Sequence, residues 1–156
     1  MDTLELIKSR SSNVIAEADS ALSRAHLNGY ENAGPETTRV RLQGLLTQIL
    51  QCVESRRAVP LIRYVETIAK ERFHHGVELF EVQTAFNALE EAIWKEMRAT
   101  MTPSNFVEAV GLLSTIIGTG KDALARSYVA LASSRHAPAL DIDRLSAGHE
   151  TSLQFD

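Results

Sequence analysis

Residues 79–100 read LFEVQTAFNALEEAIWKEMRAT, and their apolar positions decide the fold class. The large apolar residues follow one another at intervals of three or four positions: Leu79, Val82, Phe86, Leu89, Ile93 and Met97. Since an α-helix has about 3.6 residues per turn, this spacing places all these side chains along one stripe. Such a stripe is stable in water only when other helices cover it. The stretch therefore predicts a helix packed within an all-α domain.

The segments on either side of this stretch show the same helical periodicity, while strand signals are nearly absent. Pro35, Pro60 and Pro103 suit first helical positions, because proline lacks the N–H group that the first turn leaves unpaired. These patterns predict a five-helix bundle or a globin-like helical domain with a long C-terminal helix, and the periodicity does not separate the two architectures. The helices are expected over residues 3–28, 35–57, 60–75, 79–100 and 103–135.

Three segments leave the helix boundaries open. Residues 9–13 are polar and poor in helix formers, so a break in the first helix is consistent with them. Residues 29–36 contain a Gly-Pro pair and predict a loop. Gly118 and Gly120 leave a bend in the last helix or its division into two open, because each glycine costs about 1 kcal/mol relative to alanine.

The length and composition fit one domain, residues 1–135, followed by a polar C-terminal tail, residues 136–156. With 156 residues, 44% of them hydrophobic, the chain can form a core without a disulfide or a metal. Within the tail we expect one short helix near residues 141–147. Cys52, the single cysteine, lies in an apolar run and should be buried, since free cysteine is among the most buried residue types.

Charge and hydropathy exclude two classes of partner. The formal net charge is −4, and no basic stripe is present that could neutralise the phosphates of a nucleic acid. The most apolar segment, residues 109–118, is far shorter than the roughly 20 residues that a membrane span needs. The N-terminus lacks the positive start and apolar block of a secretory signal. We therefore expect a cytoplasmic protein with no nucleic-acid or membrane partner.

Glu71 and His74 form a Glu-x-x-His motif, whose side chains share one face of a helix and could together bind a metal. Di-iron helical bundles use two such motifs, and this chain contains one. The sequence therefore favours a surface pair and no metal site. A metal-dependent helical-bundle enzyme built on these two residues stays open as an alternative function.

His74 and His75 precede Gly76, the expected end of a helix, where the helix dipole favours histidine. A second interpretation makes one of them a ligand of haem or of a small molecule in a globin-like pocket. Adjacent side chains on a helix point about 100° apart, so at most one of the two could face such a pocket. Trp94 borders the apolar stripe, where we expect it to pack in the core or at an interface, and it is a further candidate for ligand binding. We expect no resident cofactor.

Small residues gather along one face of the last predicted helix. Residues 118–121 read GTGK, but the other positions of a phosphate-binding loop do not match and the flanks are helical. Small side chains instead let two helix backbones approach each other, within the chain or across a dimer seam. The candidate interface residues are Gly111, Ser114, Thr115, Gly118 and Trp94.

Residues 64–97 carry the pattern of a known family in YVETIAKERFHHGVELFEVQTAFNALEEAIWKEM. An Ala-x-Glu-Arg turn is followed by a glycine, a Leu-x-x-Val pair and a Leu-x-x-Ala-Ile run before a bulky aromatic residue. The residues are Ala69, Glu71, Arg72, Gly76, Leu79, Val82, Leu89, Ala92, Ile93 and Trp94. This stretch resembles the N-terminal domain of RsbT co-antagonist proteins, which are the RsbR-type sensors of the bacterial stressosome.

The resemblance implies a signalling role and brings no catalytic residue with it. Members of the family look like helical sensors that dimerise and relay a signal to an output domain or a partner protein. The implied function is a non-enzymatic stress-response regulator, homodimeric, whose partner is a kinase, a STAS-type protein or a phosphatase. The family usually continues into an output domain, whereas 21 residues follow the last predicted helix here. We expect the chain to act in trans on a partner or to be cut from a longer protein.

Overall fold

The computed structural model describes residues 2–136, the last two as helical backbone only. This part of the chain forms seven α-helices and no strand. The helices are α1 (Thr3–Ser9), α2 (Ser11–Ala25), α3 (Asn28–Ala33), α4 (Pro35–Ser55), α5 (Val59–His74), α6 (Leu79–Thr100) and α7 (Pro103–His136). The predicted all-α fold with a long C-terminal helix is confirmed. The short helix expected near residues 141–147 lies outside the described residues.

Helix α6 has the bounds that the apolar stripe predicts. A capping box closes its first turn, because the Glu78 and Glu81 side chains each accept a hydrogen bond from the other residue's backbone N–H. The stripe is buried at every position after Leu79, which is half-buried. The buried members are Val82, Phe86, Leu89, Ile93 and Met97. The sequence therefore located the helix at the centre of the core correctly.

A break separates α1 from α2 at Arg10, within the polar run that leaves the first helix open to interruption. The hydroxyls of Ser9 and Ser11 donate to backbone carbonyls of the preceding turn, at 2.8 Å to Leu6 O and 3.0 Å to Ile7 O. Serine side chains of this kind compete with the regular helix ladder. The break accounts for one of the two helices beyond the five expected.

The prediction of a loop over residues 29–36 is wrong for most of that segment. It contains most of α3 and the start of α4, and Gly34, with φ of 90°, is the single residue between them. Long-range contacts hold α3 in place. The Glu81 carboxylate accepts a hydrogen bond from Gly29 N at 2.7 Å, and the Tyr30 side chain is buried. Local sequence does not contain these contacts, which explains the error.

The long last helix is confirmed, and its glycines do not divide it, because α7 runs unbroken past Gly118 and Gly120. Gly120 faces the helices that cover α7. A Cβ atom there would lie 2.6 Å from Cδ2 of Leu61 on α5 and 3.1 Å from Cε1 of Phe86 on α6. The glycine therefore permits close helix packing, and that packing offsets its low helix propensity.

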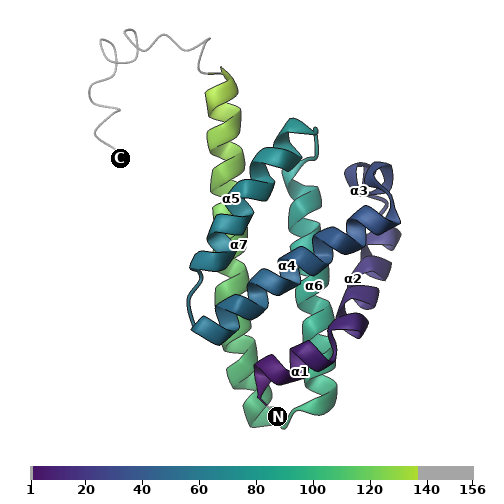
Figure 1. Ribbon diagram of the computed structural model, residues 1–156, viewed down its shortest axis with the longest axis vertical. Helices are drawn as coiled ribbons and strands as arrows, with labels where there is room; N and C mark the ends of the chain where they lie inside the picture. Colours follow the sequence, from purple (N-terminus) through teal and green to yellow (C-terminus); the bar gives the residue numbers. More distant parts are fainter. Residues whose placement is uncertain (1, 137–156) are drawn as a thin grey trace, which may run out of the picture.

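Figure 1 shows α6 and α7 as an antiparallel pair, with α4 crossing in front of them and α5 lying along α7. Helix α2 packs along α6, and α1 lies near the α6–α7 turn. Helix α3 and the α5–α6 turn lie at the opposite end of the molecule. Cys52 is buried as expected. No helix among the described residues is long and apolar enough to cross a membrane.

Candidate functional site

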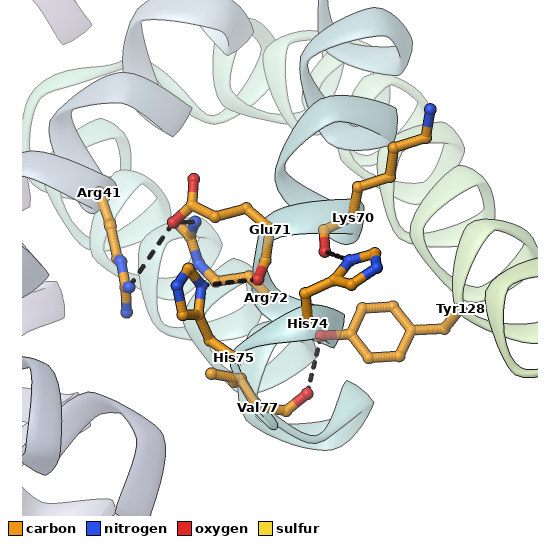
Figure 2. Close-up of polar contacts among 8 residues, drawn as sticks. All are labelled: Arg41, Lys70, Glu71, Arg72, His74, His75, Val77 and Tyr128. Atoms are coloured by element: carbon orange, nitrogen blue, oxygen red, sulfur yellow. Dashed lines mark hydrogen bonds and ion pairs between the residues drawn. The ribbon is translucent and has the colours of Figure 1, made fainter. Parts of the chain in front are cut away.

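His74 and His75 complete the end of α5, and both side chains are exposed. Each ring Nδ1 lies within hydrogen-bond distance of a carbonyl oxygen one turn earlier, 2.6 Å from Lys70 O and 2.8 Å from Glu71 O (Figure 2). The two imidazoles line different open hollows: His74 lines a groove between α5 and α7, and His75 a cleft beside α3. Neither occupies the buried position that a ligand of haem in a globin-like pocket needs.

The Glu-x-x-His pair does not converge on one point. The Glu71 carboxylate is held by two arginines instead of facing His74 (Figure 2). Among the described residues, no group of three or more His, Cys, Asp or Glu side chains could hold a metal ion. No observation in this part of the chain favours the metal-dependent enzyme.

A group of charged side chains lies beside these residues, and we call it the arginine cluster: buried Arg72, partly buried Arg41, and Glu71, whose side chain is 49% exposed. Arg72 on α5 is 4% exposed, and its Nη1 donates to Glu71 Oε1 at 2.7 Å. Arg41 on α4 approaches the same oxygen to 3.8 Å. Burial, and then the charge of Arg72, hold the pKa of Arg41 below its usual value. Two guanidinium groups therefore share one carboxylate.

Two nitrogen atoms of the cluster have no hydrogen-bond partner among the described residues. They are Arg41 Nη1 and Arg72 Nε, and both are buried. The Arg41 guanidinium also stacks on the ring of buried Tyr30, 5.7 Å from its centroid. Burial raises the pKa of Tyr30, and the charges of the two arginines partly oppose the shift. Buried unpaired donors are costly, so this cluster is the strongest sign of a functional site in the interior.

Arg41 also lines the cleft between α3 and the α5–α6 turn, which has a volume of about 510 Å³. The cleft wall is built by Glu81, whose buried carboxylate accepts hydrogen bonds from Gly29 N at 2.7 Å and from Glu78 N at 3.0 Å. On the other side of the turn, the Tyr128 hydroxyl of α7 donates to Val77 O at 2.8 Å (Figure 2). The cleft, the arginine cluster and α7 are therefore joined through the α5–α6 turn.

Sequence reasoning missed the arginine cluster, although a signal for it was present. Arg72 continues the buried stripe of α5, following Leu61, Val65 and Ile68 at intervals of four, three and four. Glu81 stands in the same way at the head of a line of buried alanines on α6. A charged residue at a core position of a helix predicts a buried charge, and buried charges need partners.

The candidate interface residues lie on the outside of α7. Gly111, Thr115 and Gly118 are exposed and Ser114 is half-buried. A Cβ atom added at Gly111 or at Gly118 would meet nothing within 4 Å. The two glycines therefore do not serve close helix packing within the chain, whereas Gly120, which was not a candidate, does.

Two exposed valines extend this surface along the helix. At about 100° per residue, the members fall within roughly 60° of one another around the helix axis. Val107 is 71% exposed and Val129 is 64% exposed. We call the surface the α7 outer face, and it consists of Val107, Gly111, Ser114, Gly118, Ala125 and Val129.

Trp94 on α6 is 38% exposed, so it is not a core residue. Lys121 Nζ on α7 lies 3.1 Å from Glu90 Oε1 on α6, which fixes the level of the two antiparallel helices. One turn after Glu90 on α6 is Trp94, and one turn before Lys121 on α7 is the level of Gly118. The tryptophan therefore lies at the level of the middle of α7.

Comparison with known proteins identifies one family. The family model described as the RsbT co-antagonist protein rsbRD N-terminal domain matches residues 14–137. This match spans α2 to α7 and extends well beyond the stretch of residues 64–97 that carries the resemblance. No curated protein and no solved structure matches the chain.

Proposed function

The chain belongs to the RsbT co-antagonist rsbRD N-terminal domain family, and on that premise we propose that it is a non-enzymatic signalling domain that dimerises through α7. The α7 outer face carries this proposal. Residues 109–120 contain no charged side chain, yet Gly111, Thr115 and Gly118 within them are exposed. The solvent face of a surface helix is normally charged or polar.

The spacing of the α7 outer face supports pairing of two helices. Its members follow one another at intervals of 4, 3, 4, 7 and 4 residues, which is the rhythm of a helix seam. The glycines at its centre would let two α7 backbones approach closely, because the distance between helix axes depends on the side chains at the contact. Val107 and Val129 would close the two ends of the seam, and Trp94 would add apolar area at its side.

The partner in signalling would be a protein that recognises the dimer. Membership of the family supports a role in stressosome-type signalling, and a kinase, a STAS-type protein or a phosphatase is the kind of partner we propose. The arrangement needs no chemistry within the domain. Its output would be the geometry of the α7 pair.

The oligomeric state tests the proposal. We expect the wild-type chain to be dimeric at tens of micromolar, and Gly118→Glu and Val107→Glu to raise the dimer Kd by about tenfold or more, which corresponds to about 1.4 kcal/mol. The matched control is Val40→Glu, because Val40 is 66% exposed near the start of α4 and lies outside the α7 outer face. Sedimentation equilibrium measures the Kd. A wild-type monomer at several hundred micromolar, or equal weakening by all three variants, would refute the proposal.

A further inference from the structure

The cleft beside α3 has the size of a small-molecule site. Its volume of about 510 Å³ lies in the range of natural ligand pockets, and it is open to solvent. Arg41 contributes to its lining and also, with Arg72 and Tyr30, to a small cavity behind it. Arg41 therefore belongs both to the lining of the cleft and to the arginine cluster.

The arginines of this cluster hold more donors than their surroundings accept. Arg41 donates no hydrogen bond to any described residue, since its 3.8 Å approach to Glu71 is too long for one. Arg72 spends its Nη1 on Glu71 and leaves its buried Nε unpaired. A guanidinium group offers a planar fork of donors that matches an anionic group such as carboxylate.

The acidic residues around the cleft do not satisfy the arginines. Glu81 directs its two carboxylate oxygens to backbone N–H groups, and Glu78 accepts from the N–H of Glu81 in the capping box. Glu71 is the carboxylate that contacts the arginines, and both of them share it. The balance of two guanidinium groups against Glu71 leaves one positive charge without a direct counter-ion. A monoanion matches this balance better than a dianion, which Glu78 and Glu81 would also repel.

The rim of the cleft indicates the rest of the ligand. Phe80 lines the cleft and is 55% exposed, although a large aromatic side chain is usually covered. Asn28 and Asn32 add amide groups that donate and accept hydrogen bonds. An apolar or aromatic body would cover Phe80 while an anionic group reaches Arg41.

We propose that the cleft binds a small organic monocarboxylate with an apolar body, its carboxylate paired with the Arg41 guanidinium and its body packed against Phe80. The bound carboxylate would accept the hydrogen bonds that Arg41 does not make within the chain. Its negative charge would also attract the Arg72 guanidinium. The cleft is separate from the α7 outer face, so the dimer proposal and this one can fail independently. The Tyr128–Val77 hydrogen bond joins the cleft to α7 and would carry the effect of binding to that helix.

Calorimetric titration of the full chain with benzoate tests the proposal, together with benzamide as the uncharged analogue and inorganic phosphate as the dianion. We expect benzoate to bind with a Kd of about 1 mM or below, and benzamide and phosphate about tenfold more weakly or not at all. Amide shifts of Gly29 and Gly76 in two-dimensional NMR would place benzoate in the cleft. The proposal would be overturned if benzoate did not bind at about 10 mM, or if phosphate bound more tightly than benzoate.

Three variants separate the contacts with the carboxylate and with the body. Arg41→Met should weaken benzoate binding by about tenfold or more, while Arg39→Met, at an exposed arginine on the same helix, should leave it unchanged. Phe80→Ser alters an exposed side chain, so the fold is retained, and should weaken benzoate by about fivefold while leaving acetate unaffected. Equal losses in Arg41→Met and Arg39→Met, or unchanged benzoate binding in Phe80→Ser, would contradict the assignment.

Discussion

The arginine cluster and the α7 outer face reverse the usual distribution of residues in opposite ways. The cluster holds one buried and one partly buried guanidinium group beside a single carboxylate. The α7 outer face exposes valines and glycines, and its central part lies within residues 109–120, which contain no charged side chain. The first arrangement costs desolvation free energy, and the second leaves apolar surface in contact with water.

This difference indicates which kind of partner the arginine cluster and the α7 outer face would each bind. Buried unpaired donors gain most from a small group that brings acceptors into a confined space. An exposed helix face of small and apolar residues gains most from a surface of similar length and shape, such as a second copy of the same helix. The two regions are linked by Tyr128 and the α5–α6 turn, so a ligand and a dimer partner would act on one connected element.

The largest expected effect tests whether the inner and outer sides of α7 tolerate a larger side chain differently. Gly120→Val should lower the free energy of unfolding by about 3 kcal/mol, because its side chain would overlap buried Leu61 and Phe86. The matched variant Gly118→Val projects into open space and should change stability by less than about 0.5 kcal/mol. Urea unfolding at low protein concentration measures both. Similar losses in the two variants would mean that the two sides of α7 are not distinct.

A smaller effect concerns the hydrogen bonds that buried Glu81 accepts at the start of α6. Glu81→Ala should destabilise the chain by about 2 kcal/mol, since the N–H groups of Gly29 and Glu78 both lose their acceptor. Glu91→Ala on the same helix is the control, because Glu91 is exposed and its ion pair with Lys95 is worth less than about 0.5 kcal/mol. Thermal or urea unfolding gives the comparison. A loss for Glu81→Ala no greater than the control would show that α3 is held by other contacts.

The smallest effect concerns the link between the two regions. Tyr128→Phe should cost about 1 kcal/mol at neutral pH by leaving Val77 O without its donor. Burial raises the pKa of Tyr128 to about 12, whereas tyrosine in an unfolded chain ionises near pH 10. The unfolded state therefore loses its proton first, and the tyrosine contribution to stability is complete below pH 10 and falls as the pH rises towards 12.

The pH dependence distinguishes the variant from wild type. Burial also raises the pKa values of Tyr30 and Tyr64, so wild-type stability should fall above pH 10 through all three tyrosines. Tyr128→Phe should show a shallower fall between pH 10 and 12. Melting temperatures measured across this range provide the test. Parallel curves for the two proteins would show that Tyr128 ionises as freely in the folded state as in the unfolded chain.

The sequence predicted those parts of the molecule that depend on neighbours along the chain. The stripe of residues 79–97 located α6 and its buried face, and prolines marked the starts of α4 and α7 within one residue. The family resemblance, drawn from residues 64–97, is confirmed over residues 14–137. Among the candidate residues, Gly111, Thr115 and Gly118 of α7 are exposed, and their role as an interface stays a prediction.

Contacts between distant segments decided the rest. Gly120 falls on the apolar stripe of α7, between Ile117 and Leu124, and Gly118 lies outside it, yet only the packing of α5 and α6 on α7 leaves no room for a Cβ atom at Gly120. Helix α3 forms where the Glu81 carboxylate, 52 residues away, accepts a hydrogen bond from Gly29 N. Arg72 is buried because Arg41 of α4 and Tyr30 of α3 lie over it. Helical periodicity is a property of one segment and can be read from it. Which face meets which neighbour, and which charges share a cavity, is a property of the assembled helices.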